Sequence, residues 1–434
     1  MKNRLTALLL LTPIFLLTAL LLSCSGVTGN SSPGTSTGMP GGGGSGSGGG
    51  SGGSGSGGGS SAGGTQFVYT ADALSFDVSG FQMGSGGLLT PVPGSPLTIP
   101  SAPPAINDPL SLAQAGKYLL VESMSPDMGT GILTYAIDFK TGALAQVNTP
   151  TPPSSNHAFL ASGPIAVDQS KMVAYVPGES ITIFPNGSSG AAALGAYAVN
   201  SDGSLSPLKG SPYSIPAETV ALDPLSRFVY VIYNGQISVM MRHSDGSLGG
   251  MAPGSPMNLP GSPASTPLEA CSFGSQAVAS PSGNFLYVTC GGSTSLNVFA
   301  VESSGQLASV QTLSPATPDD ELSGVAINPA GTLLIATKET ANAITVFGVD
   351  QASGKLTPVA TAVAGTRPNS VAFDTSGAFA YVTNGSSLIS KDFSIPGSNN
   401  LSAYAVSKTG QVTTLSGSPY TTGDAPRSVT VVHP

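Results

Sequence analysis

A short turn of the pattern Gly-x-Leu recurs along this chain, each time after an apolar stretch that contains Tyr or Phe. The copies are Gly86–Leu88, Gly142–Leu144, Gly203–Leu205, Gly246–Leu248, Gly305–Leu307, Gly354–Leu356 and Gly410–Val412, the last with Val in place of Leu. Their spacing of 43 to 61 residues is the length of one β-propeller blade with insertions. The repeat therefore predicts one supersecondary unit copied around an axis.

Three further patterns run in step with these turns. Apolar strands lead into tight turns rich in Asp, Asn, Pro and Gly at 167–170, 222–225, 279–283, 327–331 and 373–377. A second strand series is centred on Tyr69, Leu120, Tyr175, Tyr230, Tyr287, Ile335 and Tyr381. A third series, with examples at 296–301, 344–349 and 401–406, runs into the Gly-x-Leu turn and a short outer strand. Gly-Ser-Pro often closes that outer strand, at 94–96, 210–212, 254–256 and 417–419.

The two ends of the repeat complement each other. The first unit opens at Phe67–Thr70 without an inner strand, and the last unit is followed by a spare strand, Ser428–Val432. A C-terminal strand that completes the first blade would remove the exposed sheet edges. We therefore expect an all-β fold, a seven-bladed β-propeller of four-stranded antiparallel blades, closed by its C-terminal strand.

The residues before the repeat predict export. Lys2 and Arg4 precede an apolar run that ends in Leu21-Leu22-Ser23-Cys24, which resembles the lipobox of bacterial lipoproteins. The resemblance implies a signal peptide over 1–23 and a lipid on Cys24 that anchors the protein to a bacterial membrane, on the periplasmic side or at the cell surface. An uncleaved transmembrane anchor is the alternative. Residues 24–65 form the lipidated Cys and a flexible Gly/Ser linker, and 66–434 form the propeller.

Charge and cysteine content limit the partners. Charged residues are 8% of the 434 and the net charge is −8, so no basic cluster is available for nucleic acid. No cofactor is implied by any motif, and we expect a monomer. Cys271 and Cys290 flank two paired strands of one blade, where either a disulfide or two inert thiols is consistent with the sequence.

The repeat, over about residues 67–433, resembles a known family. Tyr381-Val382-Thr383-Asn384, preceded by Val371–Gly377, resembles the YVTN repeat of lactonase-like seven-bladed propellers, which include propeller-type 6-phosphogluconolactonases and are similar to fungal muconate-lactonising enzymes. Arg367-Pro368-Asn369 and Ala425-Pro426-Arg427 resemble that family's entry loops, and Ile335–Glu339 resembles a strand end with Lys338 where Asn is usual. The resemblance implies that Arg427 binds a lactone or carboxylate oxygen and that Glu339 acts as a base.

Residues that enter the inner strands are expected to surround the channel mouth. They are Asp108, Gly163, Glu218, Gln276, Ser323, Asn369 and Arg427, and Arg367 lies in one of the entry loops. Long loops are expected on the same rim at 93–108, 122–131, 148–163, 177–193, 252–275 and 385–400. Of the three histidines, His157 alone is expected on this face. We take it as a candidate base, with a solvated surface residue as the alternative.

Two classes of function remain open from the sequence. The first, which the sequence favours because His, Arg and Lys are sparse on that face, is that the loop-rich face of a tethered propeller binds a glycan, a peptide or another envelope protein. In the second, the protein is an exported lactone hydrolase, acting on an unphosphorylated lactone because few cations are available to bind a phosphosugar. No residues have metal-ligand spacing, although Asp108, Glu218 and Asn369 are oxygen donors that suit a Ca²⁺ ion.

Overall fold

The computed structural model of this chain describes residues 64–99, 108–124, 131–147, 157–161, 163–184, 187–260, 276–290, 295–314, 322–385 and 397–434. The chain divides into two compact units, Met1–Ser60 and Ser61–Pro434, and all the described residues belong to the second. The expected signal segment, Cys24 and nearly all of the Gly/Ser linker lie outside the described residues. Within the described part, no helix is long and apolar enough to span a bilayer.

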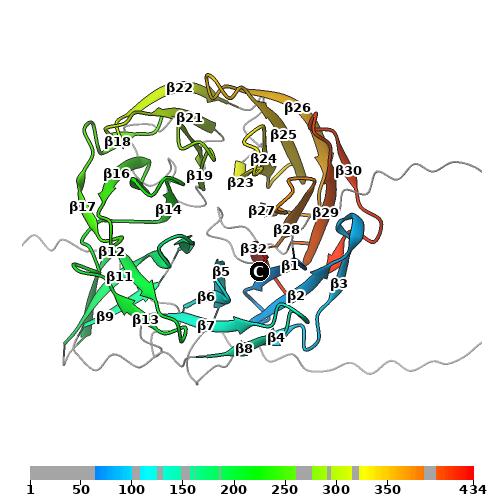
Figure 1. The fold of residues 1–434 in the computed structure, drawn as a ribbon, viewed down its shortest axis with the longest axis horizontal. Helices are drawn as coiled ribbons and strands as arrows, with labels where there is room; N and C mark the ends of the chain where they lie inside the picture. Colours follow the sequence, from blue (N-terminus) through cyan, green and yellow to red (C-terminus); the bar gives the residue numbers. More distant parts are fainter. Residues whose placement is uncertain are drawn as a thin grey trace, which may run out of the picture. The chain divides into compact units, whose positions relative to one another are not determined.

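Seven antiparallel sheets follow one another around a central axis, which confirms the predicted seven-bladed propeller (Figure 1). In the order of blades 1 to 7, the inner strands are β32 (Pro426–Val432), β5 (Asp108–Ala115), β10 (Ala166–Asp168), β14 (Thr219–Leu222), β19 (Ala277–Ala279), β23 (Leu322–Ile327) and β27 (Pro368–Phe373). The second strands are β1 (Phe67–Asp72), β6 (Tyr118–Met124), β11 (Val173–Phe184), β15 (Phe228–Tyr233), β20 (Phe285–Cys290), β24 (Leu333–Lys338) and β28 (Phe379–Asn384).

The outer half of each blade follows the same order. The third strands are β2 (Asp77–Met83), β7 (Ile132–Ile137), β12 (Gly187–Val199), β16 (Gln236–Arg242), β21 (Ser295–Val301), β25 (Ala343–Val349) and β29 (Asn400–Val406). The outer strands are β3 (Leu89–Pro91), β8 (Leu144–Gln146), β13 (Leu205–Pro207), β17 (Leu248–Met251), β22 (Leu307–Leu313), β26 (Leu356–Val363) and β30 (Val412–Thr414). Four short strands, β4 (Leu97–Thr98), β9 (His157–Ala161), β18 (Met257–Asn258) and β31 (Tyr420–Thr421), extend four of the sheets.

The C-terminal strand closes the ring, as the sequence predicts. β32 pairs with β1 in antiparallel register, with Tyr69 opposite Thr430 and Phe67 opposite Val432. Beyond the paired residues, the backbone N–H of Ala73 donates to the carbonyl of Ala425 at 3.1 Å. Closure in this way pairs the otherwise open edge of β1.

The apolar cores lie between neighbouring blades. In the interface of blades 1 and 2, Phe67 and Tyr69 pack with Leu119 and Leu133, and all four are 0% exposed. Similar clusters fill the other interfaces. Because each blade buries its two faces against its neighbours, the ring is one continuous hydrophobic structure.

Tyrosines of the second strands bond to glycines of the Gly-x-Leu turns in the next blade. The hydroxyl-to-carbonyl bonds join Tyr69 to Gly142 at 2.6 Å, Tyr175 to Gly246 at 2.5 Å and, across the ring closure, Tyr381 to Gly87 at 2.8 Å. The turn glycines have positive φ, which a side chain disfavours. The tyrosine series and the Gly-x-Leu series of the sequence therefore form one contact between blades.

The first copy of the turn is shifted by one residue from the prediction. Gly87, and not Gly86, accepts the bond from Tyr381. Leu89 begins β3 and is 5% exposed, whereas Leu88 is 42% exposed. The turn of blade 1 is therefore Gly87–Leu89. The sequence is ambiguous here because Gly86-Gly87-Leu88-Leu89 fits the pattern in two registers.

The Gly-Ser-Pro segments close the outer edges of four blades. In each copy the Ser-Pro peptide bond is cis and the Ser Oγ accepts a backbone N–H from the third strand. The donors are Gly80, Ala196, Val239 and Ala403, at 2.6 to 2.9 Å. These bonds cover part of the edge that the short outer strands leave open.

Four expected loops contain regular structure, and in two of them, 93–108 and 252–275, it is only the short strands β4 and β18. The segment 177–193 was expected to be a loop, but β11 and β12 form a hairpin that pairs continuously from Val173 opposite Ala198 to Phe184 opposite Gly187. The expected loop 148–163 contains β9, which pairs with β11. The run Glu179-Ser180-Ile181-Thr182-Ile183-Phe184 explains the difference, because β-branched and aromatic residues favour a strand.

Cys290 ends β20, is 0% exposed and is disulfide-bonded. Cys271 lies outside the described residues, so its pairing with Cys290 stays a prediction.

Candidate functional site

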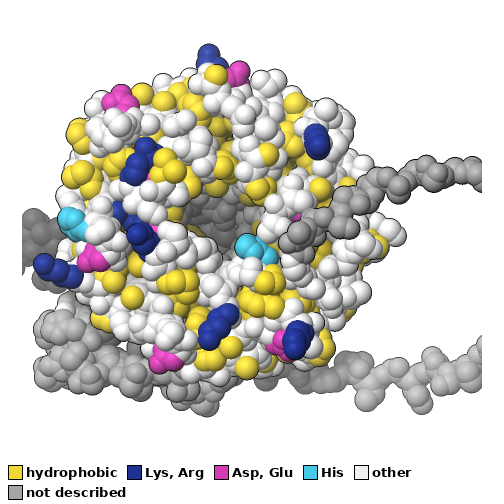
Figure 2. Space-filling model, in the orientation of Figure 1, with side chains coloured by type: hydrophobic (Ala, Val, Ile, Leu, Met, Phe, Trp, Pro, Cys, Tyr) yellow, Lys and Arg dark blue, Asp and Glu magenta, His cyan; other side chains and the backbone are white. Residues whose placement is uncertain are grey.

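The mouth of the channel is the rim where the inner strands begin. Its described residues come from the starts of the inner strands and the ends of the second strands. The Gly-x-Leu turns lie at the opposite end of the blades, because each strand reverses the direction of the one before it. Seen along the axis, the ring is hollow at its centre, and Lys and Arg side chains are scattered over the visible face (Figure 2).

An ion pair between a buried carboxylate and a partly exposed guanidinium joins blades 6 and 7 at the mouth. Glu339 follows β24 and is 1% exposed, and its Oε1 accepts a hydrogen bond from Arg367 Nη1 at 2.8 Å. Arg367 has a φ of 59°, and its backbone N–H donates to Asn342 Oδ1 at 2.9 Å. A non-glycine residue in the left-handed region is unusual, and such residues concentrate at functional sites. The structure thus brings together two of the predicted site residues.

Arg427 lies in β32 at the next position around the rim. It is 8% exposed. The preceding carbonyl, of Pro426, accepts a hydrogen bond from Asn369 Nδ2 at 2.9 Å, and Thr383 Oγ1 donates to Asn369 Oδ1 at 2.6 Å. Because both ends of its amide are engaged and it is 0% exposed, Asn369 fixes the backbone beside Arg427 and does not offer its amide to a ligand.

Glu218 precedes β14, on the other side of the axis from β27 and β32 (Figure 1). It is half-buried, and burial raises the pKa of its carboxyl to about 7, against a weak opposing bond from the Asn234 N–H to Oε2 at 3.4 Å. The backbone of Gly163 lies against the Glu218 carbonyl, where an added Cβ would be 2.5 Å from the oxygen. A carboxyl group with a pKa near 7 is suited to proton transfer at neutral pH.

Ser323 and Gln276 serve the contacts between blades. Ser323 is 0% exposed, and its Oγ donates to the Pro368 carbonyl at 3.0 Å and lies 2.8 Å from Thr337 Oγ1. Gln276 Oε1 accepts the Val325 N–H at 3.4 Å. These two residues lie at the mouth as predicted, but their polar groups link neighbouring inner strands.

Asp108 and His157 are described by their backbone alone. Asp108 begins β5 opposite Met124, and His157 begins β9 opposite Thr182. His157 therefore belongs to a strand and not to the predicted loop. Among the described residues, no group of three or more His, Cys, Asp or Glu side chains could hold a metal ion.

The sequence interpretation missed a carboxyl pair beside the ring closure. Asp72 ends β1 and Asp77 begins β2, so the two buried residues lie opposite each other beside the turn of the β1–β2 hairpin. Asp72 accepts hydrogen bonds from Thr70 and from the backbone and hydroxyl of Ser79, and the Gly423 N–H reaches it from the closing segment at 3.1 Å. Two aspartates on either side of a short hairpin turn are a signal that could have identified this pair.

The chemistry available at the mouth follows from these charges. Arg367 and Arg427 bring guanidinium groups to the rim, and guanidinium groups favour an anionic or carbonyl oxygen. Buried carboxyl groups lie there too, among them Glu339 and, near the end of β6, Glu122. Glu218 offers a proton acceptor across the channel. Guanidinium donors opposite a carboxyl group can polarise a carbonyl and accept the proton of an attacking water.

A family model matches part of the propeller. Residues 257–373 match the family model described as lactonase, 7-bladed beta-propeller. Over this segment the chain is similar to that family. The matched segment includes Glu339 and Arg367, which form the ion pair. No curated protein matches the sequence.

Solved structures support the same fold over the whole propeller. A "putative 6-phosphogluconolactonase" from Bacteroides uniformis is 16% identical with a TM-score of 0.63, covering 85% of this chain and 99% of its own. A periplasmic gluconolactonase from Pseudomonas aeruginosa is 20% identical with a TM-score of 0.59, covering 85% of this chain and 99% of its own. At these identities, the likeness establishes that the lactonase-like propeller shares their fold.

Proposed function

We propose that the channel mouth of this lactonase-like propeller binds a small sugar lactone and hydrolyses it. The observation that carries the proposal is the Glu339–Arg367 ion pair beside Arg427, across the channel from a carboxyl group with a pKa near 7. The names of the relatives, a gluconolactonase among them, favour a lactone over other carbonyl ligands. An unphosphorylated lactone fits best, because the rim offers few cations for a phosphate.

The proposed reaction assigns each group a separate task. Arg427 and Arg367 donate hydrogen bonds to the lactone carbonyl oxygen, where negative charge develops. Glu218 accepts a proton from the water that attacks the carbonyl carbon, and returns it to the ring oxygen as the C–O bond breaks. The product is a hydroxy acid. Glu339 holds Arg367 in place, because a carboxylate already bonded to a guanidinium is a poor base.

The test is hydrolysis of D-glucono-1,5-lactone by the full-length protein. Glu218→Gln removes the proton acceptor, so we expect kcat to fall by about 10²- to 10⁴-fold. Arg427→Ala should raise KM and lower kcat because it removes a donor to the carbonyl. Glu302→Gln and Lys355→Ala, which change exposed residues at the turns of the opposite face, should have no effect. Absence of hydrolysis above the buffer rate on a panel of lactones would exclude the proposal.

A second candidate function is partner binding, favoured by the extension of blade 3. The β11–β12 hairpin and β9 form three strands that continue past the mouth end of β10. Such a projection suits a glycan, a peptide or an envelope protein better than a small lactone. Replacing residues 180–191 with an Asn-Gly turn should abolish saturable polysaccharide binding and leave lactone hydrolysis intact. Unchanged binding in that variant would contradict this function.

Export and lipid attachment at Cys24 form a further part of the proposal. The disulfide at Cys290 is typical of an oxidising compartment, and a relative of the same fold is named periplasmic. The measurement is mass spectrometry of the protein from bacterial membranes. We expect an N-terminal lipidated peptide beginning at Cys24, absent in Cys24→Ala. An intact Met1 N-terminus in the membrane-bound protein would contradict it.

A further inference from the structure

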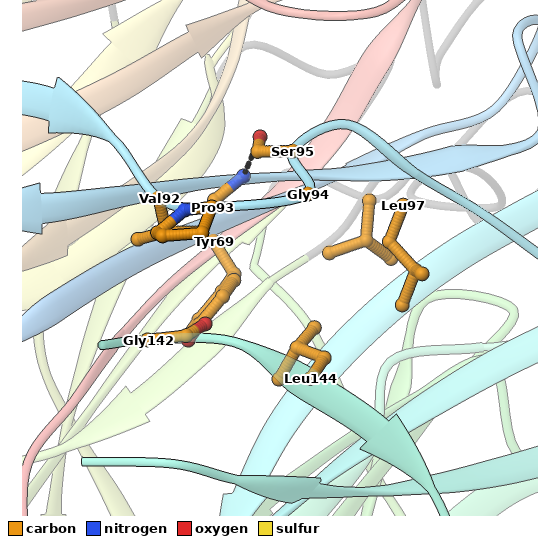
Figure 3. A pocket seen from close by; sticks show the side chains of 10 residues that line it. Tyr69, Val92, Pro93, Gly94, Ser95, Leu97, Gly142 and Leu144 are labelled. Carbon is orange, nitrogen blue, oxygen red and sulfur yellow. Dashed lines mark hydrogen bonds between the residues drawn. The ribbon is translucent and has the colours of Figure 1, made fainter. Parts of the chain in front are cut away.

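Neighbouring blades are joined by different contacts at the two ends of their strands. At the Gly-x-Leu end, a tyrosine hydroxyl donates to a turn carbonyl, as Tyr69 does to Gly142 at 2.6 Å (Figure 3). At the mouth end, side chains of one blade bond to the backbone of the turn that enters the inner strand of the next. Two of these entry turns carry Arg367 and Arg427.

The entry turn of blade 7 is held by two residues of blade 6. The backbone N–H of Arg367 donates to Asn342 Oδ1 at 2.9 Å, and the Pro368 carbonyl accepts the Ser323 hydroxyl at 3.0 Å. Arg367 has a left-handed φ of 59°. A residue that precedes proline normally has an extended backbone, so this conformation has to be held by its neighbours.

The entry turn of blade 1 is held in the same way by two residues of blade 7. The backbone N–H of Ala425 donates to Asn399 Oδ1 at 3.0 Å, and the Pro426 carbonyl accepts Asn369 Nδ2 at 2.9 Å. Ala425 also precedes a proline and has a left-handed φ of 56°. Arg427 follows that proline, so its backbone position depends on the held turn.

The hairpins that supply the two asparagines do not need them to form. Asn342 and Asn399 lie just before the third strands of blades 6 and 7, with φ values of 52° and 51°. The same place in blades 1 and 4 is occupied by Phe76 and Gly235, with φ values of 56° and 73°.

The backbone carbonyl at this place accepts an equivalent bond in all four blades. The donors, at 2.8 to 3.4 Å, are the N–H groups of Ile99, Leu259, Ala364 and Thr422. Since phenylalanine and glycine serve the hairpin equally well, the backbone does not demand a side-chain oxygen there. Of these four blades, only 6 and 7 supply that oxygen, and they precede the two entry turns that carry arginine.

We propose that Asn342 and Asn399 are positioning residues of the channel mouth, which hold the entry turns that present Arg367 and Arg427 to a ligand. Each asparagine acts through one hydrogen bond to a backbone N–H, in a conformation that the following proline disfavours. Their contribution to catalysis rests on the proposed lactone hydrolysis. The positioning of the turns does not depend on a substrate.

The kinetic test compares Asn342→Gly and Asn342→Asp in the full-length protein. Glycine keeps the left-handed backbone and removes the side-chain oxygen, whereas aspartate keeps an acceptor at the same place. We expect Asn342→Gly to lower kcat for D-glucono-1,5-lactone by about 10- to 100-fold with a smaller change in KM, because a misplaced donor is lost mainly in the transition state. Asn342→Asp should keep most of the wild-type rate. Equal rates in all three proteins, or equal losses in both variants, would overturn the contribution to catalysis.

A matched pair of variants separates positioning from general destabilisation. Asn399→Gly is the equivalent change in blade 7 and should also lower kcat, through Arg427. Asn200→Gly is the control, because the Asn200 amide bonds to Ser204 and Ser206 in a turn on the opposite face. It should lower the melting temperature and leave kcat and KM unchanged. A loss of kcat in Asn200→Gly as large as in Asn399→Gly would contradict a specific role for the mouth asparagines.

Crystal structures of the glycine variants test the positioning without a substrate. In Asn342→Gly we expect Arg367 to leave the left-handed region and its Nη1 to lose the 2.8 Å contact with Glu339 Oε1. An unchanged turn with an unchanged contact would overturn the positioning role, whatever the protein hydrolyses. Displaced turns in the variants, together with no hydrolysis by the wild type, would overturn the proposed function and support the positioning role.

Discussion

At the residue scale, glycine supports the propeller in two ways that the sequence does not distinguish. Gly86 and Gly87 have nearly equal φ values of 76° and 77°. A Cβ on Gly86 would meet nothing within 4 Å, whereas one on Gly87 would lie 2.3 Å from the Phe379 ring. Backbone conformation and close packing are therefore separable at adjacent positions.

This difference predicts unequal costs for two alanine substitutions. Gly86→Ala should lower the free energy of unfolding by about 1–2 kcal/mol, the cost of the left-handed conformation. Gly87→Ala should cost about 1–3 kcal/mol more, because the ring of Phe379 must move. Chemical denaturation of both variants checks the order. Equal losses would contradict the assignment of the blade 1 turn to Gly87–Leu89.

The residues of the candidate site were only partly predictable from the sequence. Arg367, Glu339 and Arg427 were selected by resemblance, and the structure places all three at the mouth and the first two in contact. The raised pKa of Glu218 could not be predicted, because it depends on how the chain around Gly163 and Asn234 buries the carboxyl group. The same reason applies to Asp72, whose partners Ser79 and Gly423 are far apart in the sequence.

At the element scale, charged groups fasten one blade to the next. Asp168, in the inner-to-second-strand turn of blade 3, bonds to Arg242 on β16 at 2.8 Å and accepts from Ser226 Oγ at 2.7 Å. Burial works to raise the Asp168 pKa, but hydrogen bonds from Ser170 and Ser226 and the guanidinium lower it overall. The carboxylate is therefore stabilised in its charged form.

Asp168→Ala should be among the most destabilising substitutions of a polar residue in this chain. Arg242 has a 1% exposed side chain, so the change leaves a buried cation without its carboxylate. We expect a loss of about 3–5 kcal/mol in the free energy of unfolding, measured by chemical denaturation. Asp202→Ala, which changes an exposed turn residue, is the control. Similar losses in the two variants would contradict a role for the ion pair.

The ring closure is expected to lose stability as the pH rises, because it contains a carboxyl group with a raised pKa. Burial raises the pKa of Asp72 to about 8, although hydrogen bonds from Ser79 and Thr70 oppose the shift and the neighbouring Asp77 adds to it. Asp424 is a further nearby charge, which raises the pKa of Asp77. The pKa of Asp72 in the folded protein lies above its unfolded value near 4. The contribution of the protonated Asp72 to the free energy of unfolding is therefore complete below about pH 4 and is lost as the pH rises to 8.

The closure should therefore weaken between pH 5 and pH 8. We expect the free energy of unfolding of the wild type to fall over this range and that of Asp72→Asn to fall less. The two changes should differ by about 1 kcal/mol or more. The raised pKa of Glu218 acts in the same direction, so the informative quantity is the difference between the two proteins. Parallel curves for the two proteins would show that Asp72 does not titrate in this window.

At the scale of the whole molecule, the repeat predicted what the blades share, and the irregular parts could not be predicted. The Tyr and Gly-x-Leu series predicted seven blades and the closing strand because each unit packs in the same way. The β9–β11–β12 extension departs from the repeat, so its strand pairing could not be read from the pattern.

We propose that the channel mouth hydrolyses a lactone with Glu218 as the base. The most direct measurement is the pH dependence of D-glucono-1,5-lactone hydrolysis by the full-length protein. We expect saturable hydrolysis whose kcat/KM rises with pH to a plateau, with a midpoint near pH 7 as Glu218 loses its proton. We also expect Glu218→Gln to abolish this dependence together with most of the rate. An unchanged profile in Glu218→Gln, or no hydrolysis by the wild type, would contradict the account.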